Sequence, residues 1–341
     1  MTVLVTGAGG FLGRAVVARL AADGGARVRC LVRTSAQCAS LEARLGAEAA
    51  ARVEICVGNL LSRGDAARAV EGVDTVYHLA ASLRGSPADI FLNTVVASDS
   101  LLRALDPQPD TAVALVSSLG VYGVAGLPSG SRIDEQTPLE PHPERRDVYS
   151  HAKWRQEKLF RDWRDATGRR LVILRPGVIY GPGGAPMSAR VGLNLFGLFL
   201  HLGGSSLLPL TYVDNCADAV AIAGRADGGA GEAFNVVDDG PITSRQYLRR
   251  YRRHVERRPF IRVPYALMQC LSRSTVWYHR HARGQLPAVF TPYKTASLWK
   301  GMRFDNAKLK RLGWRPSVPP EEGLARAFAY LREQARAGAS S

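Results

Sequence analysis

Short apolar runs alternate with longer mixed segments through the first half of the chain. Val3–Val5 is apolar and β-branched, and Arg14–Ala22, beyond a glycine-rich stretch, carries apolar residues at helical spacing. Further apolar runs follow at residues 27–32, 53–57, 75–79, 112–116 and 171–174. Segments of helix length separate these runs, a pattern that predicts right-handed βαβ units in a parallel sheet. Ligands of such sheets bind beyond the carboxyl ends of the strands.

The glycine-rich stretch Thr6–Gly13 (TGAGGFLG) joins the first predicted strand to the first predicted helix. Gly7 permits a tight turn, Gly10 lets the backbone approach a pyrophosphate, and Gly13 lets the helix pack closely against the strand. The helix N-terminus supplies N–H groups and a partial positive charge. Because the glycines stand between a strand and a helix, they predict a dinucleotide site rather than a plain turn.

The second predicted strand ends at Val32, and Arg33 follows it. A unit that binds NAD usually ends this strand with an acid that holds the ribose hydroxyls. Here no carboxylate repels a 2′-phosphate, and a guanidinium is present to pair with one. The sequence therefore favours NADP(H) over NAD(H). The alternative is that Arg33 is an ordinary surface arginine after a strand.

The chemistry is expected in the stretch Asp147–Thr167, which is predicted to be a helix that ends at Gly168. Tyr149 and Lys153 are four residues apart and so share a helix face. A phenol has a pKa of about 10, and a nearby ammonium lowers it, which would make Tyr149 a usable general acid/base. Ser118, at the end of an earlier strand, would hydrogen-bond the substrate oxygen.

These motifs resemble those of the extended short-chain dehydrogenases/reductases, the epimerase/dehydratase family. The similar segments are TGAGGFLG (6–13), VSSLGVYG (116–123), YSHAK (149–153), LRPGVIYGPG (174–183), TYVDNCADAV (211–220) and FDNAKLKRLGWRP (304–316). They keep the family's order over nearly the whole chain. The resemblance implies the catalytic residues Ser118, Tyr149 and Lys153. Together with the motifs, it implies cofactor contacts from Gly7, Gly10, Phe11, Leu12, Gly13, Arg33, Asn59, Leu60, Ala80, Ala81, Ser117, Tyr149, Lys153, Pro176 and Val178.

The predicted fold is α/β, a Rossmann-type doubly wound parallel sheet with a smaller α/β C-terminal substrate lobe. The dinucleotide-binding domain is expected at residues 1–183, with returning strands near 209–237. The substrate-binding lobe is expected at 184–208 and 238–316, and a C-terminal helix and tail at 317–341. The resemblance also implies a homodimer whose interface includes the helix that carries Tyr149 and Lys153.

Three departures from the family's pattern bear on function. The family's G-D-L reads Gly58-Asn59-Leu60 here, so an amide would meet the adenine. The family's N-V-x-G-T reads Thr94–Ser98, with Asn93 one position early, so the usual proton-relay Asn has no direct counterpart. Nucleotide-sugar members carry an Arg shortly before the segment that begins here at Thr211, yet residues 202–211 hold no base. The apolar stretch Leu193–Leu202 is expected to be a pocket wall or an interfacial helix.

The expected activity is that of an NAD(P)-dependent oxidoreductase that interconverts a secondary alcohol and a ketone. Its substrate is expected to be apolar or amphiphilic, such as a sterol-like compound, a lipid or a secondary metabolite. LPLTYVDN and the 295–316 tail resemble the 3β-hydroxysteroid dehydrogenase-like branch, and the VRCLVR strand end is similar to dihydroflavonol reductases. The alternatives are a nucleotide-sugar epimerase, dehydratase or reductase, and a non-catalytic NAD(P)-binding protein. A dehydratase would need an acid pair after Ser118, where Leu119-Gly120 stands.

Charge and composition limit the partners. The 341 residues include 45 Lys+Arg and 30 Asp+Glu, a net charge of +15, and five cysteines without a C-x-x-C spacing. No signal peptide or metal-ligand cluster is recognised, so a cytoplasmic, metal-free protein is expected. Arg245–Arg283 holds eleven Arg and one acid, Glu256. This segment is either a solvated basic face or a peripheral contact with an anionic membrane. No nucleic-acid-binding motif accompanies it.

Overall fold

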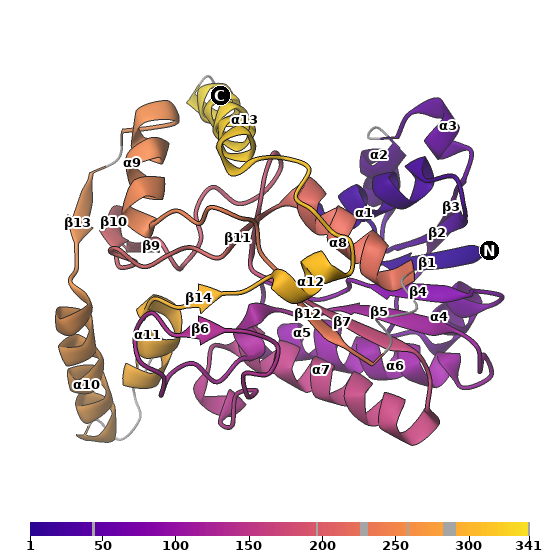
Figure 1. Ribbon diagram of the computed structural model, residues 1–341, viewed down its shortest axis with the longest axis horizontal. Coiled ribbons are helices and arrows are strands. Elements are labelled where there is room, and N and C mark those ends of the chain that lie inside the picture. The colour runs from indigo at the N-terminus through magenta and orange to yellow at the C-terminus, as the bar shows by residue number, and fades with distance from the viewer. Residues whose placement is uncertain (43–44, 196, 226–230, 258, 282–290, 340–341) are drawn as a thin grey trace.

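The computed structural model describes residues 1–341 except 43–44, 196, 226–230, 258, 282–290 and 340–341. A seven-stranded parallel sheet in the order β12-β7-β5-β4-β1-β2-β3 forms its centre (Figure 1). Its strands are β1 (Thr2–Thr6), β2 (Arg27–Val32), β3 (Val53–Val57), β4 (Thr75–His78), β5 (Ala112–Val116), β7 (Leu171–Pro176) and β12 (Ala233–Val236). The predicted doubly wound α/β sheet is confirmed.

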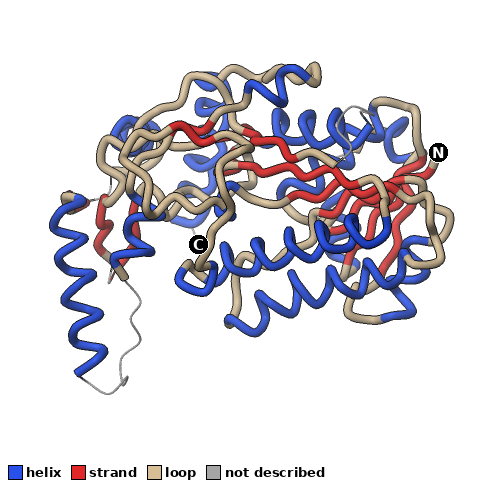
Figure 2. Tube along the Cα trace, turned by 60° about the horizontal axis from the view of Figure 1, so that its bottom comes forward, coloured by secondary structure: helices blue, strands red, loops and turns tan. Residues whose placement is uncertain are grey.

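Helices cover both faces of this sheet (Figure 2). One layer contains α1 (Phe11–Ala22) and α8 (Val213–Arg225), and the other contains α4 (Arg63–Val70), α6 (Ala97–Leu105) and α7 (Val148–Thr167). The remaining helices of the sheet domain are α2 (Ser35–Glu42), α3 (Ala47–Ala50) and α5 (Pro87–Phe91), and a π-helical turn spans Leu92–Val96.

The period of two along each strand explains the two layers. Val3 and Val5 pack into one core with α1 and α8, whereas Leu4 between them packs into the opposite core with α4, α6 and α7. A strand that is buried on both faces must be apolar throughout, which is why the sequence shows continuous apolar runs.

Helix α7 agrees with its prediction at both ends. The Asp147 side chain caps its N-terminus by accepting a hydrogen bond from Ser150 N–H, and Gly168 closes it in the left-handed conformation at φ 70°. Helix α1 begins at Phe11, three residues before the predicted start at Arg14, because Gly10 rather than Gly13 is its N-cap.

Only one of the two predicted returning strands joins the central sheet. β12 joins the central sheet beside β7, but β11 (Leu210–Tyr212) pairs with β8 (Val178–Tyr180) in a separate two-stranded sheet. The chain turns between β7 and β8 at Gly177, where an added Cβ would overlap the carbonyl oxygen of Pro209. The two backbones approach closely here, and beyond this point β8 pairs with β11 instead of continuing the main sheet.

The second lobe contains a small sheet and several helices. Its strands are β9 (Gly192–Leu195), β10 (Leu198–His201) and β13 (Phe260–Arg262), and β6 (Arg132–Ile133) pairs with β14 (Arg303–Phe304) nearby. Its helices are α9 (Ser244–His254), α10 (Tyr265–His281), α11 (Pro292–Trp299), α12 (Ala307–Arg311) and α13 (Pro320–Ala339). No helix among the described residues is long and apolar enough to span a bilayer.

Leu193–Leu202 was expected to be a pocket wall or an interfacial helix, and the helix alternative is wrong. These residues form the antiparallel hairpin β9–β10, whose turn contains Gly197 at φ 80°. Leu193 and Leu200 pack against a small core that includes Met268 and Trp299. A ten-residue apolar run is short for a helix, and glycine with positive φ favours a hairpin turn.

Candidate active site

Expected site residues lie beyond the carboxyl ends of four neighbouring strands. Gly7 follows β1, Ala80 and Ala81 follow β4, Ser117 follows β5, and Pro176 ends β7. The first two ends are joined because the Thr6 hydroxyl oxygen accepts hydrogen bonds from the N–H groups of Leu79 at 3.2 Å and Ala80 at 3.3 Å. The topology thus brings segments that are far apart in sequence to one edge of the sheet.

The glycine turn has the geometry of a pyrophosphate cradle. Gly7 has φ 70°, and its carbonyl accepts the Gly10 N–H at 2.9 Å. A Cβ on Gly13 would overlap that same carbonyl, and one on Gly7 would lie 3.0 Å from the backbone nitrogen of Ala80. No side chain caps α1, and no acid stands in its first turn, which begins with Phe11 and Leu12. Backbone donors and the helix dipole are therefore directed at an anion, as a dinucleotide requires.

The adenine side of the site is more open. Arg33 is exposed beyond β2, and its Nη1 donates to Asn93 Oδ1 at 3.4 Å. The Asn59 side-chain oxygen accepts the Leu61 N–H at 3.0 Å, and its amide NH2 group is available for an adenine contact. Leu60, in contrast, is buried in the core beneath the strands. Asn93, in addition to its contact with Arg33, donates from Nδ2 to Asp89 O at 2.8 Å.

Ser118 and Tyr149 come together as expected. Ser118 follows β5 and accepts the Gly120 N–H at 3.1 Å. Tyr149 stands in the first turn of α7, where burial raises its pKa to about 12 and the Ser118 hydroxyl opposes that rise. At neutral pH the phenol therefore carries its proton and can donate a hydrogen bond.

The position of Lys153 corrects one expectation. Its Nζ donates to Val116 O and to Gln156 Oε1, each at 2.7 Å, and the side chain is buried. Burial lowers the Lys153 pKa to about 7. The expected lowering of the Tyr149 pKa by this ammonium is wrong for this structure, because the amine is held by its own partners and burial of the phenol dominates.

Gln156 connects Lys153 to a buried polar network that the sequence analysis missed. Its Nε2 donates to Ser98 Oγ at 2.8 Å and lies 3.2 Å from His78 Nε2. The His78 ring also contacts Ser98 and, through Nδ1 at 2.8 Å, Thr6. His78 is therefore a buried core histidine whose two ring nitrogens both have polar partners. The available signal for Gln156 was its spacing, three residues beyond Lys153 on the same helix face.

Ser117 belongs to a second buried network rather than to an open cofactor surface. Its hydroxyl donates to Glu157 Oε2 at 2.6 Å, and Arg175 Nη2 donates to Glu157 Oε1 at 2.6 Å. Arg175 also donates to the Tyr122 hydroxyl at 2.7 Å. The Ser117 hydroxyl proton and backbone N–H are both already donated, the latter to Leu174 O at 2.7 Å. Pro176, at the end of β7, is buried, and Val178, at the start of β8, is half-buried.

The comparison with known proteins identifies the family. Residues 3–236 match the NAD dependent epimerase/dehydratase family, which is more than half of the chain. The chain belongs to this family. It is an enzyme of the short-chain dehydrogenase/reductase type that uses a nicotinamide cofactor, in agreement with the expected activity class.

The relatives of this chain are named for different activities. The chain is 26% identical over 307 residues to an Arabidopsis thaliana 3beta-hydroxysteroid-dehydrogenase/decarboxylase, an alignment that covers 83% of this chain and 68% of the relative. It is also 26% identical over 356 residues to the UDP-glucose 4-epimerase of Mycolicibacterium smegmatis, covering 98% and 100%. The crystal structure of gox2253 has the same fold, with a TM-score of 0.77, 24% identity and coverage of 98% and 99%.

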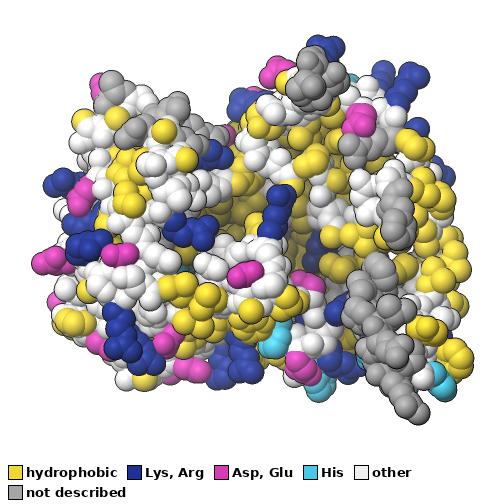
Figure 3. Space-filling view, turned by 180° about the vertical axis from the view of Figure 1, so that it is seen from behind, with side chains coloured by type: hydrophobic (Ala, Val, Ile, Leu, Met, Phe, Trp, Pro, Cys, Tyr) yellow, Lys and Arg dark blue, Asp and Glu magenta, His cyan; other side chains and the backbone are white. Residues whose placement is uncertain are grey.

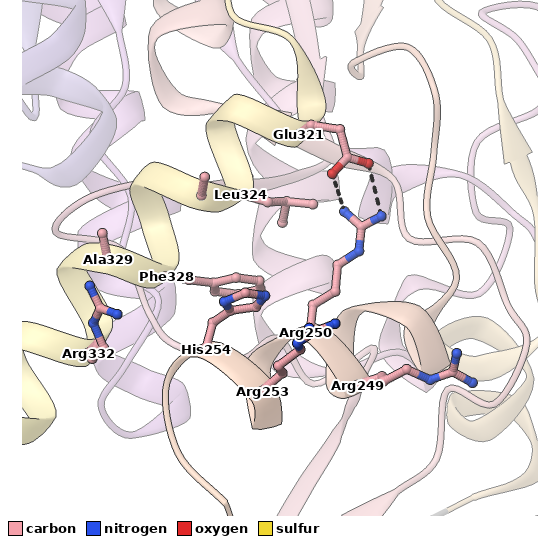
Figure 4. A pocket seen from close by; sticks show the side chains of 10 residues that line it. Arg249, Arg250, Arg253, His254, Glu321, Leu324, Phe328, Ala329 and Arg332 are labelled. Atoms are coloured by element: carbon pink, nitrogen blue, oxygen red, sulfur yellow. Dashed lines mark hydrogen bonds and ion pairs between the residues drawn. The ribbon is translucent and has the colours of Figure 1, made fainter.

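A separate hollow lies outside the family's motifs, between α9 and α13 (Figure 4). It has a volume of about 440 Å³. Arg250 donates two hydrogen bonds to Glu321 across it, and the His254 ring stacks on Phe328. None of the expected site residues lines it. Among the described residues, no three His, Cys, Asp or Glu side chains gather as a metal site would require.

Proposed function

We propose that the protein interconverts a secondary alcohol and a ketone on an apolar or amphiphilic substrate, with NADP(H) as the favoured cofactor. The observation that carries this proposal is the pairing of Ser118 with the protonated Tyr149 phenol, at the same carboxyl-end edge of the sheet as the Gly7–Gly13 cradle. The bound nicotinamide would give or take up hydride at the substrate carbon.

The chain's own residues supply the remaining chemistry. In the reductive direction Ser118 and Tyr149 hydrogen-bond the substrate oxygen, and Tyr149 gives that oxygen its proton. Lys153 would hold the cofactor's ribose hydroxyls, and Val116 O and Gln156 fix its amine. The phenol is protonated at neutral pH because its pKa is about 12, which suits a proton donor.

Two observations support an apolar substrate. Residues 202–211 contain no base that would grip a diphosphate, and the neighbouring hairpin β9–β10 is apolar. In addition, one relative is named a hydroxysteroid dehydrogenase/decarboxylase. A sterol-like, lipid or other hydrophobic ketone is therefore the first substrate class to test.

NADP(H) is favoured because β2 ends without an acid and Arg33 stands exposed after it. A 2′-phosphate would find the guanidinium there and no opposing carboxylate. We also propose, from the family resemblance, a homodimer whose interface includes α7. A reducing, cytoplasmic location is supported by five cysteines that form no disulfide.

A nucleotide-sugar epimerase, dehydratase or reductase is the second candidate, and one observation favours it. Arg190, between β8 and β9, is near enough to Asp147 at the N-terminus of α7 for their charges to interact. Burial lowers the Arg190 pKa to about 10, so the guanidinium stays charged at neutral pH. Its Nη1 donates to Leu298 O at 3.4 Å. Such a cation would suit an anionic group on the substrate.

One screen separates these functions. The purified protein is incubated with NADPH or NADH and with sterol-like, acyl or nucleotide-sugar ketones, and cofactor oxidation is followed by absorbance. Turnover of apolar ketones with NADPH is the expected result. Turnover of nucleotide-sugars alone would overturn the apolar substrate, and a preference for NADH would overturn the role of Arg33. Cofactor binding without turnover of any ketone would favour the non-catalytic alternative.

A further inference from the structure

Helices α9 and α10 and the strand β13 between them follow one edge of the molecule (Figure 1). Large apolar side chains are exposed along the lower part of this edge. Leu267 and Leu271 are each 49% exposed, Tyr278 is 51% exposed and Trp277 is 61% exposed. Figure 3 shows hydrophobic side chains gathered along this edge, which lies on its right. Soluble monomers seldom leave such side chains clustered in water.

Helical geometry arranges these residues as one stripe. At 100° per residue, Leu267, Leu271 and Tyr278 fall on one line of α10, and Cys270 and Trp277 fall on the line beside it. The opposite face of α10 packs inward, because Met268 and Ser272 are buried and the Ser272 hydroxyl lies 2.6 Å from Thr295 Oγ1 of α11. The helix is therefore held to the lobe by one face and presents the other outward. Figure 2 shows it projecting beyond the rest of the described chain.

Exposed arginines accompany the stripe. These are Arg245, Arg249 and Arg253 on α9, Arg257 after it, Arg262 on β13, and Arg273 on α10. The only acid between residues 245 and 281 is Glu256. Four of the aromatic residues in this segment differ in exposure. Tyr247 and Tyr251 are buried against Phe328 of α13, whereas Trp277 and Tyr278 are exposed on the stripe.

We propose that this edge docks on an anionic lipid bilayer, with the stripe of α10 in the headgroup boundary and the arginines on the phosphates. Trp and Tyr favour that boundary because they have an apolar body and a polar tip. Arginines beside an apolar helix face add electrostatic attraction to anionic lipids. Arg258 and residues 282–283 of the Arg245–Arg283 segment lie outside the described residues.

The positive charge of this edge distinguishes between two possible partners, a second copy of the chain and an anionic surface. A second copy of the chain would bring two arginine-rich surfaces together, and these surfaces repel each other. An anionic surface has the opposite sign and can also accept the apolar stripe. The docking goes beyond the proposed function and does not depend on it. If the substrate is apolar, docking would place the enzyme where that substrate partitions.

The test is vesicle co-sedimentation of the full chain. Vesicles of phosphatidylcholine with 30% phosphatidylserine, a fraction of the order used to mimic an anionic leaflet, are compared with pure phosphatidylcholine. We expect binding at least about tenfold stronger to the anionic vesicles, and weaker binding as salt rises. The double variant L271E/W277E should lose at least about tenfold in affinity. The control Leu83→Glu, at a side chain that is 71% exposed elsewhere, should bind like the unaltered chain.

Three results would overturn the proposal: no binding to anionic vesicles, equal binding by L271E/W277E, or binding to polyglutamate but not to vesicles. The last of these would assign the edge to an acidic protein. Turnover of a small water-soluble ketone separates this test from the proposed function. L271E/W277E should keep the unaltered rate, which also shows that it is folded. If no ketone is turned over, the proposed function fails while the vesicle result still decides the docking.

Discussion

Glu157 is the residue on which the buried polar core of the site depends. It accepts hydrogen bonds from Ser117, Arg161 and Arg175, and its side chain is fully buried. Burial acts to raise the Glu157 pKa, but the Arg175 guanidinium and its other partners hold that pKa below its ordinary value. The carboxylate is therefore ionised in the folded protein, and the loss of its partners would lower the free energy of unfolding.

Replacing Glu157 with Gln should lower the free energy of unfolding by about 3 kcal/mol, because the Arg175 charge is left buried without its counterion. Urea unfolding followed by circular dichroism measures the change. Lys158→Ala is a matched control on the next residue, since Lys158 forms an exposed pair with Asp162. That variant should lose less than about 1 kcal/mol. Equal losses in the two variants would show that the buried pair has no special importance.

Tyr149→Phe tests the proposed proton donor directly. The variant keeps the ring and loses only the hydroxyl, so we expect cofactor affinity within about twofold of the unaltered chain and turnover reduced by at least about 100-fold. Cofactor fluorescence titration and steady-state kinetics provide the two measurements. Turnover that survives the substitution would reject Tyr149 as the acid.

Lys153 should give cofactor binding a pH dependence. Its pKa is lowered to about 7 by burial, so the free protein carries the ammonium below pH 7 and loses it above. Because binding to ribose hydroxyls uses the charged donor, NADPH affinity should fall by about tenfold between pH 6.5 and pH 9. Titrations across this range measure the fall. Lys153→Met should bind more weakly and show no such fall, and a pH-independent affinity in the unaltered chain would contradict the assignment.

At the level of elements, local signals predicted what local chemistry determines. Helix α7 was predicted from Asp147 to Thr167 with its end at Gly168, and the structure agrees because both ends are set by neighbouring residues. The glycine turn was predicted for the same reason. The hairpin β9–β10 was missed, since a ten-residue apolar run fits a helix or a strand and only its packing partners decide between them.

The site shows the same limit. Ser118, Tyr149 and Lys153 follow from motifs, but the partners of Gln156 do not. His78 and Ser98 are 78 and 58 residues away from Gln156 in the chain, and only the sheet topology brings them together. For the same reason, the sequence could not show that Val116 O and Gln156 hold the Lys153 amine. The error about the Tyr149 pKa came from that missing tertiary information.

The junction of β1 and α1 should be intolerant of a single methyl group. A Cβ on Gly13 would overlap the Gly7 carbonyl, so Gly13→Ala must separate helix from strand and deform the cradle. We expect a loss of about 2 kcal/mol in the free energy of unfolding and at least about tenfold weaker NADPH binding. Gly64→Ala is the control, because Gly64 lies in α4 with open space around its Cα. It should leave binding unchanged, and equal effects in the two variants would refute the packing argument.

Considered as a whole, the molecule places titratable groups inside the interface between its sheet and its helices. His78, Lys153 and Glu157 are buried within two hydrogen-bond networks, while most other charges are on the surface. The stability of the fold and the chemistry of the site therefore share residues. A change in pH that alters the protonation of these residues must therefore affect both the stability of the fold and the chemistry of the site.

His78 should make the protein less stable in acid. Burial, and then the Lys153 charge, lowers the His78 pKa from 6.5 to about 3. Between these values the unfolded chain binds a proton that the folded chain does not, so stability falls by up to about 1.4 kcal/mol for each pH unit below 6.5. Asp238 acts in the opposite direction, because burial raises its pKa to about 6 and the folded chain then binds the extra proton below that pH.

The contribution of His78 to the acid sensitivity must therefore be isolated by comparing variants. Urea unfolding at pH 7 and pH 5 should show His78→Asn losing at least about 1 kcal/mol less on acidification than the unaltered chain. The exposed His142, replaced by Asn, should reproduce the unaltered loss. If His78→Asn loses as much as the His142 control, the acid sensitivity belongs to other groups.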